Sequence, residues 1–114
     1  MGSDRARGRV AERIADVMFA LSTPSRVQLL LCLVDGPQSV SQLVDRVEGE
    51  QSAVSHQLRV LREHSLVRVD RDGRRRVYAL ADDEVAGLLE HAARHVQDLA
   101  ARSASRRRIR AQGG

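Results

Sequence analysis

The stretch that most constrains the fold is residues 50–66, EQSAVSHQLRVLREHSL, because it has two chemically different faces. Val54, Leu58 and Leu61 recur at helical spacing, so one face of a helix is expected to pack against a core. Short hydrogen-bonding side chains and one guanidinium occupy the other face: Gln51, Ser52, Ser55, His56 and Arg59. A helix in the major groove of DNA meets base edges with its N-terminal residues. Ordinary solvated helices have similar faces, so the neighbouring stretches must decide.

A short helix precedes this stretch and is joined to it by a glycine. Ser39 and Gln42 have the spacing of a capping box, which predicts that a helix begins just after Ser39. The apolar residues of 40–47 recur at helical spacing, and Gly49 then breaks the chain. Two helices joined by a short turn, the second with a polar outer face, predict a helix-turn-helix.

After Leu66 the repeat of apolar residues changes from the helical period to the alternation of β-strands. Residues 67–70 and 76–80 are predicted to form two strands, and Asp72-Gly73 between them is a hairpin signal. A hairpin directly after the second helix is a wing. Its arginines are candidates for contacts with DNA phosphates, the alternative being a solvated basic turn. They are Arg71, Arg74 and Arg75.

The remaining apolar patterns predict three further helices, at residues 10–21, 25–34 and 82–102. The middle one is apolar almost all round and contains Cys32, which we expect to be a buried core thiol. The last has apolar residues spaced by four and three, a coiled-coil-like seam that needs either the first helix or a second copy of the chain as partner. This seam comprises Val85, Leu89, Ala92, Val96 and Leu99.

The predicted fold is mainly α-helical with a small β-hairpin, a winged helix-turn-helix of order α-α-α-α-β-β-α that forms a homodimer. This DNA-binding and dimerisation domain occupies residues 10–101. Residues 1–9 are expected to form a mobile arm. The basic tail at 102–114 has arginines and no acid, so we expect it to be disordered and to add non-specific attraction to DNA.

The charge of the chain favours a polyanionic partner. All 19 basic residues are arginines, and against 15 acidic residues they leave a net charge of +4. Aromatic residues make up only 2% of the chain, which disfavours stacking on single strands and favours duplex DNA. No apolar run reaches the ~18 residues of a membrane span, and no catalytic motif is present. We therefore expect a cytoplasmic DNA-binding protein, not an enzyme, with no membrane partner.

Several of these segments together resemble a known family. The TPSR helix start, SAVSHQLRVLR, the basic hairpin ending in Val-Tyr-Ala-Leu and a last helix opened by Asp-Asp are similar to the ArsR/SmtB family of winged-helix metal-sensing repressors. The resemblance covers residues 10–100, and SAVSHQLRVLR is its most specific part. It implies a homodimer paired mainly through the first and last helices and bound to a pseudo-palindromic operator. It also implies an inducer that weakens DNA binding.

The same resemblance implies a metal site on the last helix, with ligands from both protomers. The matching positions are Asp82, Glu84, His95 and Asp98. Glu84 stands where the family usually has histidine, which leaves a harder donor set and favours Ni(II), Co(II) or a weaker response to Zn(II). His91, one turn before His95, is a further candidate.

The residues of the last helix also suggest a cation on their own account. Residues 82–98 contain five acids and one arginine, a net charge of −4 in a basic chain. At 100° per residue, Glu84, His91, His95 and Asp98 fall within about 60° of one another and form one stripe. Such a stripe is also typical of a solvated face. Asp82, just before the helix, is equally suited to cap the helix amides.

The predicted function is that of a dimeric transcriptional repressor whose operator binding is modulated by Ni(II), Co(II) or Zn(II). Two alternatives stay open. One is a winged-helix regulator that is independent of metal. The other is an activator or co-regulator whose ligand is sensed by a partner protein.

Overall fold

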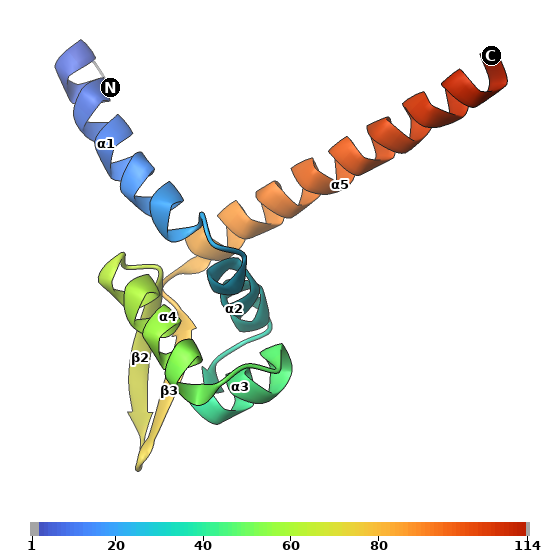
Figure 1. The fold of residues 1–114 in the computed structure, drawn as a ribbon. Helices are drawn as coiled ribbons and strands as arrows, with labels where there is room; N and C mark the ends of the chain where they lie inside the picture. The colour runs from blue at the N-terminus through green and yellow to red at the C-terminus, as the bar shows by residue number, and fades with distance from the viewer. Residues whose placement is uncertain (1–2, 114) are drawn as a thin grey trace.

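The computed structural model describes residues 3–113, which form five helices and three strands (Figure 1). In chain order these are α1 (Asp4–Ala20), α2 (Pro24–Val34), β1 (Gln38–Ser39), α3 (Val40–Val47), α4 (Gln51–Glu63), β2 (Val67–Asp72), β3 (Arg75–Leu80) and α5 (Asp83–Gly113). The helices α2, α3 and α4 and the sheet form one body, from which α1 and α5 extend as two arms (Figure 1). The architecture agrees with the predicted helical fold with a small β-hairpin.

The core lies where α2, α3 and α4 meet the sheet. Its largest fully buried side chains are Leu30, Leu43, Leu58 and Leu61. Burial of one such side chain stabilises a fold by about 1.5–3 kcal/mol. Cys32 is a buried free thiol, as the apolar run around it predicts. The helix α2 is not buried all round, however, because Leu31 and Val34 are 46% and 38% exposed.

The turn between α3 and α4 is fixed by a cap before α3 and by close packing after it. The Ser39 hydroxyl accepts a hydrogen bond from the Gln42 amide at 3.3 Å, and the Gln42 side chain accepts one from the Ser39 amide at 2.8 Å. These two bonds are the predicted capping box. After α3, Glu48 has the left-handed conformation, with φ 53°. Gly49 instead allows the backbone to pack closely against α4, because a Cβ there would lie 3.2 Å from a methyl group of Val54.

The wing is a two-residue hairpin within a three-stranded sheet. β2 and β3 pair antiparallel from Val67 opposite Leu80 to Asp72 opposite Arg75, and Gly73 turns the chain with φ 65°. The third strand, β1, pairs with the other edge of β3, so the order is β1-β3-β2. The sequence did not predict β1, because two residues are too few to show an alternating pattern.

Both terminal helices are longer than the sequence predicts. α1 begins at Asp4, inside the segment expected to be a mobile arm, and the Ser3 hydroxyl caps it by accepting the Ala6 amide at 3.1 Å. α5 continues to Gly113, through the tail expected to be disordered. The predicted helix ends near Val10 and Arg102 are therefore wrong. Arginine and alanine are strong helix formers, and residues 88–111 contain no glycine or proline to end the helix.

Apolar side chains on the two arms lie in solvent. Of the residues in α1, only Ala20 is buried. The predicted seam of α5 divides in two: Val85 and Leu89 join the core, whereas Val96 and Leu99 are 63% and 46% exposed. On α1, three large apolar side chains are exposed as well: Ile14, Met18 and Phe19. Such exposed apolar patches mark surfaces that associate with a partner.

Candidate nucleic-acid interface

The helix α4 lies with its apolar face on the core and its polar face in solvent. Val54, Leu58 and Leu61 are buried, as predicted from their spacing. Gln51 and Ser52 are exposed at the helix N-terminus, and the N-cap residue Glu50 makes no side-chain bond to the helix amides. These amides are therefore free of a side-chain cap, and helix N-termini attract phosphate.

An open groove runs between α4, the start of α3 and the wing. We call it the recognition groove, and it is lined by Ser39, Val40, Ser41, Gln51, Ser52, Ser55, His56, Arg59, Arg62, Arg74, Arg75, Arg76 and Tyr78. The fold thus brings together all the predicted DNA-contacting residues except Arg71. Arg71 lies on β2, an outer strand of the sheet. The groove is lined instead by β3, the central strand, which pairs with β1 directly before α3.

Sequence reasoning missed several lining residues. Arg62 lies one turn after Arg59, so helical periodicity alone would have placed it on the same face. Arg76 is not among the predicted contacts, although it follows Arg74 and Arg75 directly in the chain. Ser41 and Tyr78 carry no comparable signal, since they reach the groove only because α3 and β3 pack beside α4.

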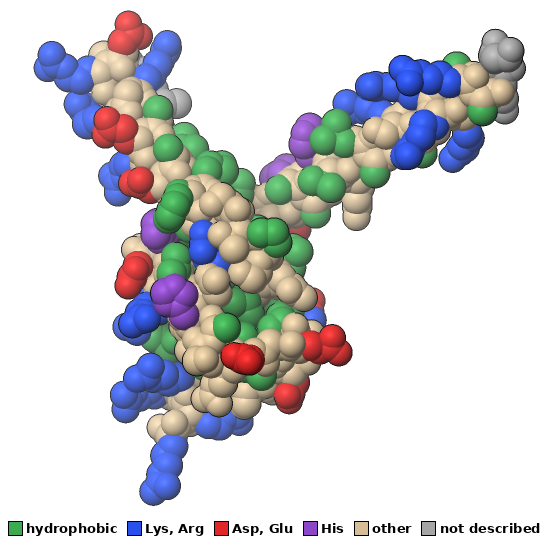
Figure 2. Space-filling view, viewed as in Figure 1, with side chains coloured by type: hydrophobic (Ala, Val, Ile, Leu, Met, Phe, Trp, Pro, Cys, Tyr) green, Lys and Arg blue, Asp and Glu red, His purple; other side chains and the backbone are tan. Residues whose placement is uncertain are grey.

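The groove is positively charged. Its ionisable side chains, apart from His56 and Tyr78, are arginines, and no acidic residue lines it. Within residues 3–113 the ion pairs are Arg46 with Asp35 and Arg68 with Asp70, so none of the groove arginines is neutralised by an acid. Figure 2 shows blue side chains along the wing at the lower end of the molecule. These guanidinium groups are available for phosphates.

A hydrogen bond within the groove orients the ring of His56. The Arg59 guanidinium lies 3.3 Å from Nδ1 of this ring. Because arginine can only donate, Nδ1 must accept, which places the proton of the neutral ring on Nε2. The His56 ring is exposed. It therefore has a donor at Nε2 for an acceptor in the DNA.

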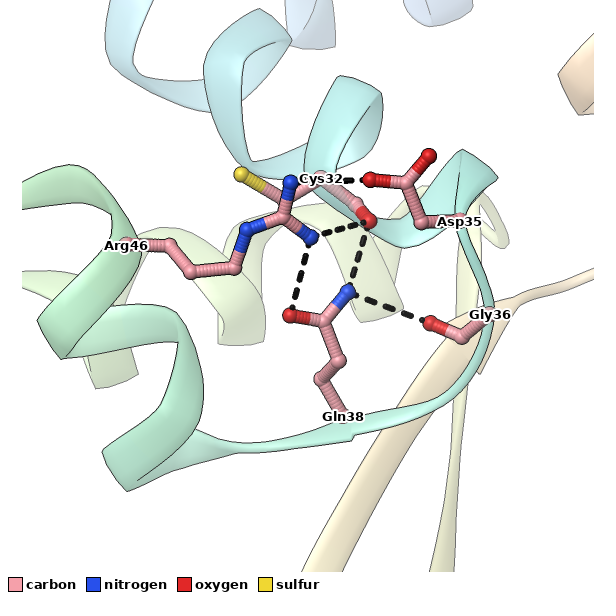
Figure 3. A network of polar contacts seen from close by, with 5 residues as sticks. All are labelled: Cys32, Asp35, Gly36, Gln38 and Arg46. Carbon is pink, nitrogen blue, oxygen red and sulfur yellow. Dashed lines mark hydrogen bonds and ion pairs between the residues drawn. The ribbon is translucent and has the colours of Figure 1, made fainter.

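A polar network outside the groove lining joins α3 to the end of α2 (Figure 3). Arg46 donates to the Cys32 carbonyl at 3.1 Å and to the Gln38 side chain at 3.2 Å, and it pairs with Asp35 at 2.8 Å. Gln38 in turn donates to the same carbonyl at 2.6 Å. The hydrogen bond to Asp35 raises the pKa of the Arg46 guanidinium. The network therefore ties β1 and α3 to the end of α2.

The acidic stripe on α5, Glu84, His91, His95 and Asp98, is exposed along its whole length. No three ligand-type side chains within residues 3–113 gather around a common point. Glu84 and His95 are eleven residues apart, which is about 16 Å along a helix. One α5 therefore cannot bring these side chains to one metal ion.

Two residues of the predicted metal set already have partners. The Asp82 carboxylate accepts the Val85 amide at 3.0 Å, so it caps α5 as its position suggested. The His91 ring nitrogen Nδ1 lies 2.9 Å from the guanidinium of Arg94. Each still has a second oxygen or nitrogen atom for another partner.

Sequence comparison identifies the chain at the level of its family. The fold and groove define a winged helix-turn-helix DNA-binding protein, and residues 23–69 match the sequence model of the bacterial regulatory protein arsR family. The chain is 48% identical over 91 residues to the HTH-type transcriptional regulator NmtR of Mycobacterium tuberculosis, covering 80% of this chain and 76% of that protein. It is 40% identical over 88 residues to a transcriptional repressor SmtB homolog of Synechocystis, covering 77% and 67%. The chain belongs to the ArsR family of transcriptional regulators.

Solved structures support the same assignment. The solution structure of apo-NmtR matches with a TM-score of 0.70 at 47% identity, over 80% of this chain and 76% of that one. The homodimeric winged helix-turn-helix DNA-binding domain Mb0332 of Mycobacterium bovis matches with a TM-score of 0.73 at 28% identity, over 86% and 89%. The expected fold and family are thereby confirmed, and the chain is a regulator and not an enzyme.

No single helix within residues 3–113 is long and apolar enough to cross a membrane. The pair α1 and α2 passes the same test by length and composition, but it bends by 90° at the break. Much of α2 is buried in the core, where apolar character is expected of a core helix.

Proposed function

We propose that the chain is a homodimeric repressor that binds a pseudo-palindromic DNA operator and is released from it by a transition metal. The recognition groove is the observation that carries the DNA-binding part. It combines the polar N-terminal turns of a helix with arginines that form no ion pair with the acidic residues of the described range, 3–113. Because a DNA operator is part of the chromosome, the proposed location of the protein is the cytoplasm.

In this proposal α4 enters the major groove and the wing follows the backbone. Gln51, Ser52, Ser55 and His56 contact base edges, and the Nε2 donor of His56 matches the acceptors that guanine presents in the major groove. The groove arginines bind phosphates, and they are Arg59, Arg62, Arg74, Arg75 and Arg76. Arg71, on the outer strand of the wing, is proposed to bind a phosphate further along the duplex.

The homodimer is proposed from the exposed apolar surface of the arms. Val96 and Leu99 on α5 and the exposed side chains of α1 need a partner that is equally apolar. A second copy of the chain offers this same surface about a two-fold axis. The similar Mb0332 domain is homodimeric. Two recognition helices about 34 Å apart then meet successive turns of one face of the duplex.

The metal site is proposed to form only between two protomers. In the proposed dimer, antiparallel α5 helices place Asp82 and Glu84 of one copy beside His95 and Asp98 of the other. The ligands are then close together, although within a single α5 Glu84 and His95 are far apart. Three carboxylates and one imidazole, with His91 as a second imidazole, form a donor set that suits Ni(II) or Co(II) better than tetrahedral Zn(II). A bound ion would hold the two helices at a fixed spacing. Coupling of ~1–3 kcal/mol is enough to release DNA.

Selection from random duplexes tests the DNA-binding part. Sequences enriched by the protein should contain two inverted half-sites with centres about 10 base pairs apart. Enrichment of a single half-site would contradict the dimer, and no enrichment would contradict operator recognition.

One observation favours a second candidate function. The stripe is exposed and His91 is bonded to Arg94, as in a solvated face. In that case the chain regulates without metal, or a partner protein senses the ligand. Titration with each metal separates the candidates, because only the metal-responsive repressor loses operator affinity.

A further inference from the structure

One buried arginine connects the arm α1 to the recognition helix α4. Arg26, on the first turn of α2, is only 9% exposed. Its guanidinium donates to the Ala20 carbonyl at 2.6 Å and to the Phe19 carbonyl at 3.2 Å. It also donates to the side-chain oxygen of Gln57 on α4 at 3.1 Å. Three helices therefore meet at one side chain.

The two carbonyls belong to the end of α1, where helix carbonyls lack partners within the helix. A cation there also interacts favourably with the helix dipole. The Arg26 guanidinium lies 5.8 Å from the centre of the Phe19 ring as well. No acidic residue within residues 3–113 pairs with Arg26, so its charge is balanced by these carbonyls, the ring and Gln57 alone. An uncompensated buried charge is costly, which keeps the arginine bound to them.

A second contact joins the same end of α1 to α4. The rings of Phe19 and His64 lie 5.9 Å apart, and His64 is fixed by a 2.9 Å bond to the Val60 carbonyl. Gln57 and His64 are seven residues apart, about 10 Å along the helix. Two contacts this far apart fix the angle between α1 and α4 as well as the distance between these helices.

Gln57 is not part of the recognition groove. It does not line the groove. At 100° per residue it lies about 160° from both Ser55 and Arg59, on the opposite side of α4. Its partner Arg26 is buried, so neither side chain is placed to contact DNA.

We propose that Arg26, acting through Gln57, is a positioning residue that sets the angle between α1 and α4. This inference rests on the proposed homodimer, in which α1 belongs to the shared interface. With α1 held by the partner copy, the angle determines how far apart the two recognition helices lie. Specific operator binding then depends on a side-chain bond that touches neither DNA nor the dimer partner.

The test variant is Gln57→Ala, which removes the α4 end of the connection and leaves both α1 carbonyls bound by Arg26. Gln57→Glu is the conservative rescue, because it keeps an acceptor and adds a charge-assisted bond. Gln97→Ala is the matched control, since Gln97 is exposed on α5 away from the stripe and the seam. Binding to a duplex selected by the wild type, and to a scrambled duplex, is measured for each.

Gln57→Ala should weaken binding to the selected duplex about tenfold, leave the scrambled duplex unaffected and keep the dimer. Spin labels on Glu63→Cys, in a Cys32→Ala background, report the distance between the two α4 helices. That distribution should broaden in Gln57→Ala and narrow again in Gln57→Glu. An unchanged distribution and affinity would overturn the proposal, as would a lower melting temperature alone. Failure of the proposed function would look different, because it would appear in the wild-type protein itself. The wild type would then select no DNA sequence, or it would be a monomer.

Discussion

The recognition groove and the α5 stripe differ in how much of each a single chain assembles. The groove is complete in one copy, because α3, α4 and β3 pack around a common core and bring their polar side chains together. The stripe has suitable side chains on one exposed helix, and nothing in residues 3–113 brings three of them to one point. DNA contact is thus built into the body of the monomer, whereas the proposed sensing site needs a second copy. Mutations should therefore be able to remove DNA recognition and metal sensing separately.

The largest effect is expected from Ser55→Ala combined with His56→Ala. Two base contacts at about 1–3 kcal/mol each correspond to a loss of about thirtyfold or more in affinity for the selected duplex. Fluorescence anisotropy measures the affinity, and sedimentation shows that the dimer remains. Binding to a scrambled duplex is the control and should change little. Retained preference for the selected duplex would show that this face of α4 does not read the sequence.

Next in size is His95→Ala combined with Asp98→Ala on the stripe. In the wild type, a metal that binds should weaken operator binding by about 5- to 150-fold, and the double variant should keep wild-type DNA affinity at any metal concentration. Calorimetric titration with Ni(II), Co(II) and Zn(II) gives the stoichiometry. About one or two ions per dimer are expected for the wild type. Equal binding by wild type and variant would exclude the stripe as the site.

A smaller effect, of a different kind, is expected from Arg74→Ala with Arg75→Ala. Each phosphate contact contributes about 0.9 to the slope of log affinity against log salt, so the slope should fall by about 2. Selected and scrambled duplexes should lose affinity alike, because phosphates carry no sequence information. Arg107→Ala with Arg108→Ala on the outer part of α5 is the matched control. An equal fall in that control would indicate general charge and not the groove.

The smallest effect separates the two roles of Asp82. Asp82→Ala removes the cap on α5 and should lower the free energy of unfolding by about 1 kcal/mol. Asp82→Asn keeps a capping oxygen, so urea denaturation should show a smaller loss. Both variants should weaken metal binding if this carboxylate is a ligand. Metal affinity that is unchanged in both would leave the cap as its only function.

Much of the fold was predictable because it depends on local periodicity. The capping box at Ser39 and the buried face of α4 follow from spacing alone, and both are found. The ends of α1 and α5 were predicted wrongly, because a polar, glycine-containing start and a basic tail do not prevent a helix where arginine and alanine favour one. The pairing of β1 with β3 joins residues nearly forty positions apart, which no local pattern encodes.

The sequence by itself determined the helices, the wing, the family and most of the polar side chains that line the groove. Only the tertiary structure decided that Ser41, Arg76 and Tyr78 share the groove, that Arg71 lies outside it, and that Val96 stays exposed. It alone revealed the connection from Arg26 to Gln57. The reason is physical: a helix or strand is set by neighbours a few residues away, whereas a groove or an interhelical bond depends on how separate elements pack.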